Sequence, residues 1–250
     1  MWIFCCGMQR SGSTLQFQIT ARLVEEAGLG KRVEWVKAER FSKLRKQHAV
    51  DQNWKVLKTH ACSEKMAKEF DRQNAKGIYC YRDLRDAYVS CMRKHELTFE
   101  QLWETAFIET CLRQFNKWMA LPRVLASKYE TMLTDVPGEV ERIAAHLGIS
   151  IDNEKCQQIA AEYNLERQKE RIEEAKKEGK LKRAYGNAFF DPHTQLHANH
   201  IYSGATGGWK GALSEEQVEK IEALAGDWLV AQGYVIKSLS HCRSLVIESL

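Results

Sequence analysis

The segment GMQRSGST at residues 7–14 holds residue types that bind phosphate. It follows the apolar run 2–6 and precedes a helix-like segment, an order that predicts a strand, a turn and a helix N-terminus. Glycines let backbone N–H groups converge on an anion, and the helix dipole adds to the attraction. A Walker A loop needs lysine directly after its second glycine, but Ser13 stands there and the cation, Arg10, lies upstream. We therefore predict an anion site and disfavour an ATP-hydrolysing P-loop; an ordinary strand-to-helix turn is the alternative.

A second pattern, IYCYRDLRDAYVS at residues 78–90, repeats this order. Arg82 lies at the carboxyl end of the expected strand, and the helix that follows carries Ser90. Ligands of parallel sheets bind outside the carboxyl ends of the strands, so another anion is expected there. An ion pair between Arg82 and Asp83 or Asp86 is the structural alternative.

A third pattern, VLKTH at residues 56–60, places Lys58 and His60 at the carboxyl edge of a strand, with Thr59 facing the other way. A histidine at such an edge can act as a general base, whereas a hydrogen-bonded structural histidine is the alternative. Each pattern alone has a structural explanation, but the three together indicate a nucleotide site more strongly than any one of them.

In this order the patterns resemble the signatures of the sulfotransferases that use 3′-phosphoadenosine 5′-phosphosulfate (PAPS). The first signature of that family grips the 5′-phosphosulfate and is similar to the run Arg10, Ser11, Gly12, Ser13 and Thr14. The second, R-x₇-S, grips the 3′-phosphate and is matched by Arg82 and Ser90. The resemblance implies PAPS as the co-substrate, adenosine 3′,5′-bisphosphate (PAP) as the leaving product, and no metal.

Lys58, Thr59 and His60 resemble the K-T-H element of cytosolic members, which carries a catalytic histidine. The resemblance implies that His60 takes the proton of the acceptor while Arg10 and Lys58 stabilise the bridging oxygen as its bond to sulfur breaks. By analogy with phosphoryl transfer, the protein positions an in-line attack and neutralises charge on the leaving phosphate.

Two weaker matches lie towards the C-terminus. SKYETML at residues 127–133 looks like the Y-E-D-[ML] strand end of the family, and GATGGWK at 204–210 resembles its G-x-x-G-D-W-K loop, which closes over the nucleotide. The family places Arg-Lys before that glycine, whereas this chain has Tyr202 and Ser203. We assign Ser203 and Gly204 to the nucleotide site and leave open which groups complete the 3′-phosphate shell.

The dimer element of the family, K-x₃-T-V-x₃-E, is only partly present. Lys210 and Glu219 are kept, but Ser214 and Glu215 stand in the middle. The sequence does not predict dimerisation by that route, and the oligomeric state stays open.

The elements that must position these residues alternate along the chain. The expected strands are 2–6, 54–57, 77–81 and 124–129, and the expected helices are 13–27, 63–73, 84–94, 99–120, 136–147 and 214–232. Unalternating apolar strands between helices predict an α/β fold with a central parallel sheet and helices on both faces. We expect one domain over residues 1–250 with a P-loop-like sulfotransferase architecture.

Two segments depart from this alternation. Residues 164–183 hold thirteen charged side chains and predict an exposed helix, with a lid as the alternative. Residues 184–210 are rich in Gly, Asn, His and aromatics and are expected to form the loop that closes over the nucleotide. The acceptor lining is expected from loops and helices such as 99–118 and 164–190.

Histidines and tryptophans offer two further interpretations. His193, His197 and His200 invite a metal site, but Pro192 and the lack of helical periodicity weaken it, and we expect no metal. The candidates for stacking on adenine are Trp209, Trp54 and Trp35. Aromatic residues in or beside strands are more often core, so the stacking residue stays open.

Composition excludes several classes. The chain has 250 residues and a net charge of +4, too mild for a nucleic-acid-binding face. No apolar run approaches the roughly 20 residues of a membrane helix, and residues 1–8 lack the features of a signal peptide. The eight cysteines show no zinc spacing and read as buried thiols, so a cytoplasmic protein is expected.

The sequence therefore predicts a sulfotransferase that moves a sulfuryl group from PAPS to an acceptor hydroxyl, in preference to an amine. The acceptor is a small molecule or a polymer, and no nucleic-acid partner is expected. The alternatives are a P-loop nucleotide kinase, which Ser13 opposes, and a catalytically silent nucleotide-binding protein, which turnover would distinguish.

Overall fold

The computed structural model describes residues 1–183, 189–198 and 204–237. Contacts group the chain into two compact units, each described by itself below. Unit 1 comprises Met1–Tyr81 and Gln114–Gly204, and unit 2 comprises Arg82–Arg113 and Ala205–Leu250.

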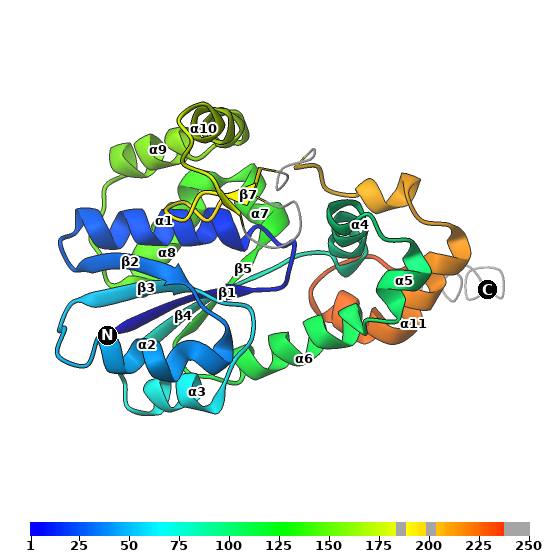
Figure 1. The fold of residues 1–250 in the computed structure, drawn as a ribbon. Helices are drawn as coiled ribbons and strands as arrows, with labels where there is room; N and C mark the ends of the chain where they lie inside the picture. Colours follow the sequence, from blue (N-terminus) through cyan, green and yellow to red (C-terminus); the bar gives the residue numbers. More distant parts are fainter. Residues whose placement is uncertain (184–188, 199–203, 238–250) are drawn as a thin grey trace, which may run out of the picture. The chain divides into compact units, whose positions relative to one another are not determined.

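Unit 1 is built on a parallel sheet of five strands in the order β2-β3-β1-β4-β5 (Figure 1). The strands are β1 (Trp2–Gly7), β2 (Gly30–Trp35), β3 (Trp54–Lys58), β4 (Ala75–Tyr81) and β5 (Val124–Lys128). The central strand β1 pairs with β3 from Trp2↔Lys55 to Cys5↔Lys58 and with β4 from Trp2↔Ala75 to Gly7↔Cys80. Because the pairing is parallel, the carboxyl ends of all five strands share one edge of the sheet.

Helices cover both faces of this sheet, as the sequence predicts (Figure 1). On one face, Ile3 and Cys5 of β1 pack in a core with α1 (Ser13–Glu26) and α8 (Val136–Leu147). On the other face, Phe4 packs against aromatic side chains of α2 (Phe41–Gln47) and α3 (Glu64–Asp71). A fully buried side chain such as Phe4 contributes roughly 1.5–3 kcal/mol to stability.

Several elements of unit 1 lie outside the predicted set. They are β2, the 3-10 helix η1 (Ala38–Arg40), α2, α7 (Tyr129–Thr134), α9 (Asn153–Glu162) and the hairpin of β6 (Lys182–Arg183) with β7 (Phe189–Phe190). The expected strand 124–129 ends at Lys128, because Tyr129 begins α7. The charged stretch forms α10 (Leu165–Lys177), which begins at its N-cap Asn164, so its helical character is confirmed; a lid role stays a prediction.

Unit 2 contains α4 (Leu84–His95), α5 (Phe99–Trp103), the start of α6 (Phe107–Met119), η2 (Gly208–Gly211) and α11 (Glu215–Ala231). The prediction of one helix over 99–120 is wrong, because residues 104–106 interrupt it. Ala106 has φ 51°, in the left-handed region, which an α-helix does not allow. Tyr88 packs against Phe99 and Phe107 on the two sides of this break.

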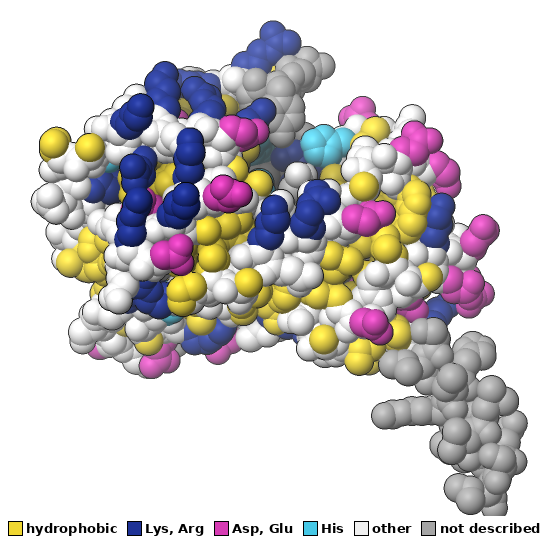
Figure 2. Space-filling view, turned by 90° about the horizontal axis from the view of Figure 1, so that it is seen from below, with side chains coloured by type: hydrophobic (Ala, Val, Ile, Leu, Met, Phe, Trp, Pro, Cys, Tyr) yellow, Lys and Arg dark blue, Asp and Glu magenta, His cyan; other side chains and the backbone are white. Residues whose placement is uncertain are grey.

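The described surface carries many basic side chains, and the described cysteines are thiols. Within the described ranges, none of the helices has both the length and the apolar character needed to cross a membrane. Basic side chains lie on the face seen from below (Figure 2), and the exposed ones of α2 and α3 include Lys43, Arg45, Lys46, Lys65 and Lys68. Seven cysteines in the described part of the chain are free thiols, and Cys242 lies outside the described residues.

Candidate functional site

The loop between β1 and α1 has the backbone shape of a phosphate cradle. Gly12 is the N-cap of α1 with φ 83°, and Arg10 also has a positive φ of 67°. A Cβ on Gly12 would lie 2.5 Å from Cδ2 of Tyr129, and one on Gly7 would lie 2.5 Å from the carbonyl oxygen of Cys80. Close contacts therefore require glycine at both positions, and at Gly12 the left-handed conformation requires it as well.

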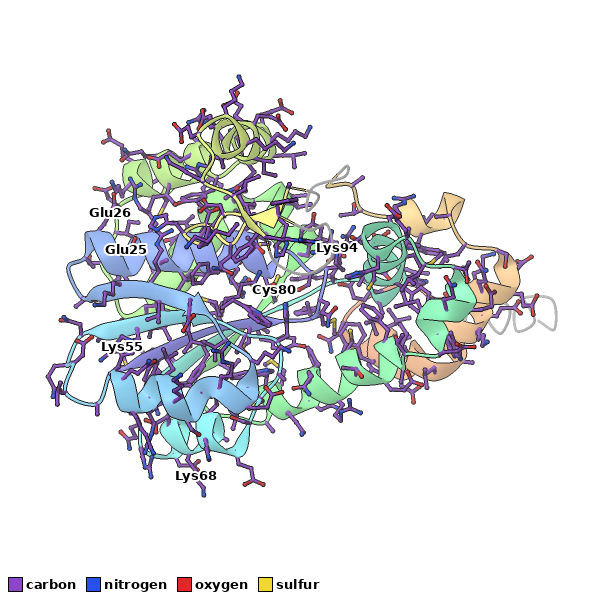
Figure 3. The ribbon with its side chains drawn as sticks, viewed as in Figure 1. Glu25, Glu26, Lys55, Lys68, Cys80 and Lys94 are labelled. Atoms are coloured by element: carbon purple, nitrogen blue, oxygen red, sulfur yellow. The ribbon has the colours of Figure 1, made fainter. Side chains whose placement is uncertain are left out.

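Hydrogen bonds tie this loop to the end of β4. The Met8 N–H donates to the Cys80 carbonyl at 3.0 Å, and the Ser11 hydroxyl lies 2.7 Å from the Met8 carbonyl and 2.9 Å from the Cys80 carbonyl. Cys80 is labelled in Figure 3, on β4. Ser11 is fully buried, so its hydroxyl serves the shape of the loop. The first turn of α1 holds no acidic residue, which keeps its N-terminus electropositive.

Lys58, at the end of β3, reaches this loop. Its Nζ donates to Oγ1 of Thr14 at 2.5 Å, and both residues are buried, at 5% and 8% exposure. The structure thus brings a residue of the third sequence pattern into contact with the first. Thr59 is fully buried, and its N–H donates to the Cys5 carbonyl at 3.0 Å, which fixes the strand end.

His60 lies two residues beyond Lys58 and is partly buried. Its Nδ1 lies 2.8 Å from the carbonyl oxygen of Gly7. A carbonyl oxygen only accepts, so Nδ1 carries the proton in this hydrogen bond and the neutral ring has its lone pair on Nε2. The Gly7 carbonyl thus orients the imidazole in the tautomer that a general base needs. We call residues 7–14 with Lys58 and His60 the phosphate-loop region.

In unit 2, Arg82 and the loop 205–211 are joined by polar contacts. Nη2 of Arg82 donates to the Ala205 carbonyl at 2.7 Å and lies 3.6 Å from the carboxylate of Asp86. That carboxylate accepts from the backbone N–H of Gly207 at 2.7 Å and of Trp209 at 3.0 Å. We call residues 82–86 with 205–211 the closing-loop region. Sequence reasoning placed Asp86 beside Arg82 but did not predict its hydrogen bonds to the loop, because Gly207 is 121 positions from Asp86 in the sequence.

Arg85 is a second residue that sequence reasoning missed. Its guanidinium carbon lies 4.0 Å from the ring centroid of Trp209, and it pairs with Asp83 and Glu222, each at 2.7 Å. Burial alone would lower the pKa of Arg85, but the hydrogen bonds that it donates to the carboxylates of Asp83 and Glu222 outweigh burial and raise that pKa. Trp209 is itself buried and packs against Val218.

The remaining predicted residues lie on several elements, and some of them lie outside the described part. Ser90 is partly exposed on α4. The Gly204 carbonyl accepts from the Tyr129 hydroxyl at 3.3 Å. Among the other adenine candidates, Trp54 packs against the core of unit 1 and Trp35 is 39% exposed. Tyr202, Ser203 and His200 lie outside the described residues.

The two described histidines of the metal interpretation have other contacts. The ring of His197 stacks on Phe190 with centroids 5.5 Å apart. The backbone N–H of His193 donates to the carboxylate of Asp191. In the part of the chain that the structure describes, no three His, Cys, Asp or Glu side chains group to hold a metal ion.

Comparison with known proteins decides the family. The model of the sulfotransferase domain matches residues 2–232. The chain belongs to the sulfotransferase family. Its reaction is therefore the transfer of a sulfuryl group, and the expectation of a sulfotransferase is confirmed. A comparison with curated proteins found no significant match.

Solved structures show the same fold. This sulfotransferase is similar to retinol dehydratase in complex with androsterone and inactive cofactor PAP, with a TM-score of 0.62, 20% identity, and 91% of this chain and 80% of that chain covered. It is also similar to retinol dehydratase in a complex with retinol and PAP (TM-score 0.61, 21% identity, 91% and 81% covered). A mouse sulfotransferase, SULT7A1, complexed with PAP gives a TM-score of 0.60 at 18% identity, with 91% and 84% covered. The predicted α/β sulfotransferase fold is confirmed.

Proposed function

We propose that this sulfotransferase transfers the sulfuryl group of PAPS to an acceptor hydroxyl, with His60 as the general base. The observation that carries the proposal is the phosphate-loop region itself. Lys58 bonds to Thr14 at the helix N-terminus, and the Gly7 carbonyl at the start of the same loop orients His60. The cationic Lys58 and the proposed base His60 thus both contact the loop 7–14, whose backbone suits an anion.

In this proposal the loop and the N-terminus of α1 hold the 5′-phosphosulfate. The contributors are the backbone N–H groups of residues 10–14 and the hydroxyls of Ser13 and Thr14, while Ser11 contributes through its backbone. The acceptor oxygen attacks sulfur as the bond from sulfur to the bridging oxygen breaks, and Nε2 of His60 takes the acceptor proton. Arg10 and Lys58 stabilise the charge that develops on the leaving phosphate.

We assign the 3′-phosphate of the donor to Arg82 and Ser90, and Ser203 and Gly204 to the nucleotide site; which groups complete the 3′-phosphate shell stays open. Support comes from the R-x₇-S spacing and from the placement of Arg82 at the strand-to-helix junction. The bond from Arg82 to the Ala205 carbonyl holds its guanidinium beside the loop 205–211. A guanidinium is the side chain best suited to phosphate, because it donates two parallel hydrogen bonds.

The acceptor is a hydroxyl in preference to an amine, and we propose a small molecule over a polymer. The neighbouring retinol dehydratase structures contain androsterone and retinol, which supports small-molecule acceptors. The free thiols of the described part support a reducing, cytoplasmic setting.

One experiment tests the donor assignment. Melting of the wild type and of Arg82→Ala is measured with PAP, adenosine 5′-monophosphate and ATP, and transfer is measured with labelled PAPS against a panel of alcohols and amines. PAP at 100 times its Kd should stabilise the wild type by about 2.7 kcal/mol, and ATP should not. Arg82→Ala should lose most of the PAP shift and keep the shift with adenosine 5′-monophosphate.

Three outcomes would contradict the proposal. A shift with ATP equal to that with PAP would favour a nucleotide kinase. A PAP shift without any transfer across the panel would favour a silent nucleotide-binding protein. Equal weakening of PAP and adenosine 5′-monophosphate by Arg82→Ala would make Arg82 structural.

A further inference from the structure

Two side chains of α6 hold the backbone of the segment that follows β3. Nε1 of Trp118 donates to the carbonyl oxygen of His60 at 3.1 Å, and the N–H of Cys62 donates to Oε1 of Gln114 at 2.9 Å. All four residues belong to unit 1. Gln114 and Trp118 are four positions apart and so share one face of the helix. That face binds residues 60–62 on both sides of Ala61.

Trp118 has a fixed position in the core. It is fully buried, and its ring centroid lies 5.8 Å from that of Phe4 on β1 and 6.2 Å from that of Phe70 on α3. A side chain packed in this way keeps its rotamer, so the indole N–H is a fixed donor. The carbonyl of His60 is therefore held by the same core that supports the sheet.

The ring and the backbone of His60 are held by different partners. The Gly7 carbonyl sets the rotation and the tautomer of the imidazole. It does not set the position of the Cα atom from which the ring extends. The backbone there is held on one side by the bond from the Thr59 N–H to the Cys5 carbonyl, and on the other by the bond that Trp118 donates and the bond that Gln114 accepts. A displacement of about 1 Å at a reacting group can cost roughly 10²-fold in rate.

The geometry points to Gln114 and Trp118 as positioning residues of the transfer reaction, which hold His60 where its Nε2 reaches the acceptor proton. This inference rests on the proposed role of His60 as the base. Gln114 and Trp118 hydrogen-bond to residues 60–62 and not to the loop 7–14 that we assign to the donor, so we expect them to affect the chemical step and not nucleotide binding.

Replacing Gln114 provides the cleanest test. Gln114→Leu removes the acceptor for the Cys62 N–H and should lower kcat roughly 10- to 10²-fold, with the PAP-induced melting shift unchanged. Gln114→Glu keeps an oxygen at the same place and should restore most of the wild-type kcat. Asn116→Leu, exposed on the same helix, is the matched control and should leave kcat unchanged.

Trp118→Phe gives an independent variant, because it keeps an aromatic ring in the core and removes only the indole N–H. It should lower kcat in the same range at an unchanged PAP shift. Melting of each variant without ligand is compared with that of the wild type. If Trp118→Phe does not fold, the Gln114 pair still decides the proposal.

The thiol of Cys62 reports the state of the segment without reference to activity. Burial raises the pKa of Cys62 to about 11, so its alkylation by iodoacetamide at neutral pH should be slow in the wild type. Loss of the bond from its own N–H should speed alkylation of Cys62 in Gln114→Leu, measured by peptide mass mapping. Asn116→Leu should leave that rate unchanged.

A double variant separates positioning from general stability. In a His60→Ala background there is no base left to misplace, so Gln114→Leu should cause little further loss of kcat. Full additivity of the two losses, or a wild-type kcat in Gln114→Leu, would overturn the positioning role while leaving His60 as the base. A wild-type kcat in His60→Ala would overturn the base and the positioning role with it.

Discussion

The phosphate-loop region and the closing-loop region are held by different kinds of contact. In the first, neutral backbone groups dominate: the carbonyls of Gly7, Met8 and Cys80 accept from His60, Ser11 and the loop itself. In the second, charged side chains dominate, because Asp86 accepts two backbone N–H groups and Arg82 donates to a loop carbonyl. The phosphate-loop region depends on glycines, which have no Cβ atom, at positions 7 and 12. The closing-loop region depends on the buried side chains of Arg82 and Asp86.

This difference decides what each region tolerates. A backbone-held loop changes little with pH or salt but has no room for an added methyl group. A loop held by a buried carboxylate loses two hydrogen bonds at once when that carboxylate is removed, and its cationic neighbour loses its counter-charge. Substitutions can therefore damage the two regions separately.

The largest effect is expected in the phosphate-loop region, at His60. His60→Ala should lower sulfuryl transfer by roughly 10²- to 10⁴-fold, as is typical of the loss of a positioned base, and should leave the PAP melting shift nearly intact. Steady-state transfer and melting are measured on one preparation. A parallel fall of unliganded stability, nucleotide shift and transfer would instead identify a structural histidine. If transfer stays at the wild-type rate, Glu64 is the next base to test.

The next effect is expected in the closing-loop region. Asp86→Ala leaves the N–H groups of Gly207 and Trp209 without their acceptor in a buried site, since Asp86 is only 4% exposed. We expect a loss of about 3 kcal/mol in the free energy of unfolding, measured by urea denaturation. Asp86→Asn keeps one acceptor oxygen and should cost about half as much. A cost under about 0.5 kcal/mol for Asp86→Ala would show that the carboxylate does not hold the loop.

A smaller effect should follow from an added methyl group at Gly12. Gly12→Ala combines a left-handed φ of 83° with a Cβ that would lie 2.5 Å from the Tyr129 ring. Gly28→Ala is the matched control, because Gly28 has φ 65° and nothing within 4 Å of its Cβ position. The control should cost about 1 kcal/mol of unfolding free energy, and Gly12→Ala about 1 kcal/mol more. Equal costs in the two variants would show that the contact with Tyr129 is not tight.

The sequence predicted the central strands and the phosphate-loop region because their signals are local. Unalternating apolar runs mark β1, β3 and β4, and the glycines of the loop stand within six residues of each other. It missed β2, because half of its residues GKRVEW are charged and none is fully buried, as suits an edge strand.

Contacts between distant segments escaped sequence reasoning. Asp86 reaches Gly207, and Trp118 reaches His60 across 58 positions. Nothing in the local pattern distinguishes these side chains from their neighbours on amphipathic helices. Nor does the local pattern mark Ala106, whose left-handed φ interrupts the predicted helix 99–120.

The smallest effect is expected on the stability of unit 1, which holds the phosphate-loop region, and it comes from the buried carboxyl group of Glu139. Glu139 on α8 is 2% exposed; its carboxylate accepts from the Ser127 hydroxyl and from Arg142. Burial raises the pKa of Glu139, and the contacts with Ser127 and Arg142 oppose this without cancelling it. Even if neutral contacts hold the phosphate-loop region, the stability of unit 1 should therefore depend on pH through this carboxyl, among other groups.

The direction of the pH effect follows from linkage. In the unfolded chain Glu139 ionises at its ordinary pKa, whereas the fold favours its protonated form. Its contribution to stability is therefore greatest below the ordinary pKa and falls as pH rises through the raised folded value. The difference in unfolding free energy between wild type and Glu139→Gln, measured by urea denaturation from pH 4 to pH 8, should shift in favour of Glu139→Gln with rising pH. A difference that moves towards the wild type with rising pH would show that Arg142 and Ser127 outweigh burial, and that a charged contact stabilises unit 1 after all.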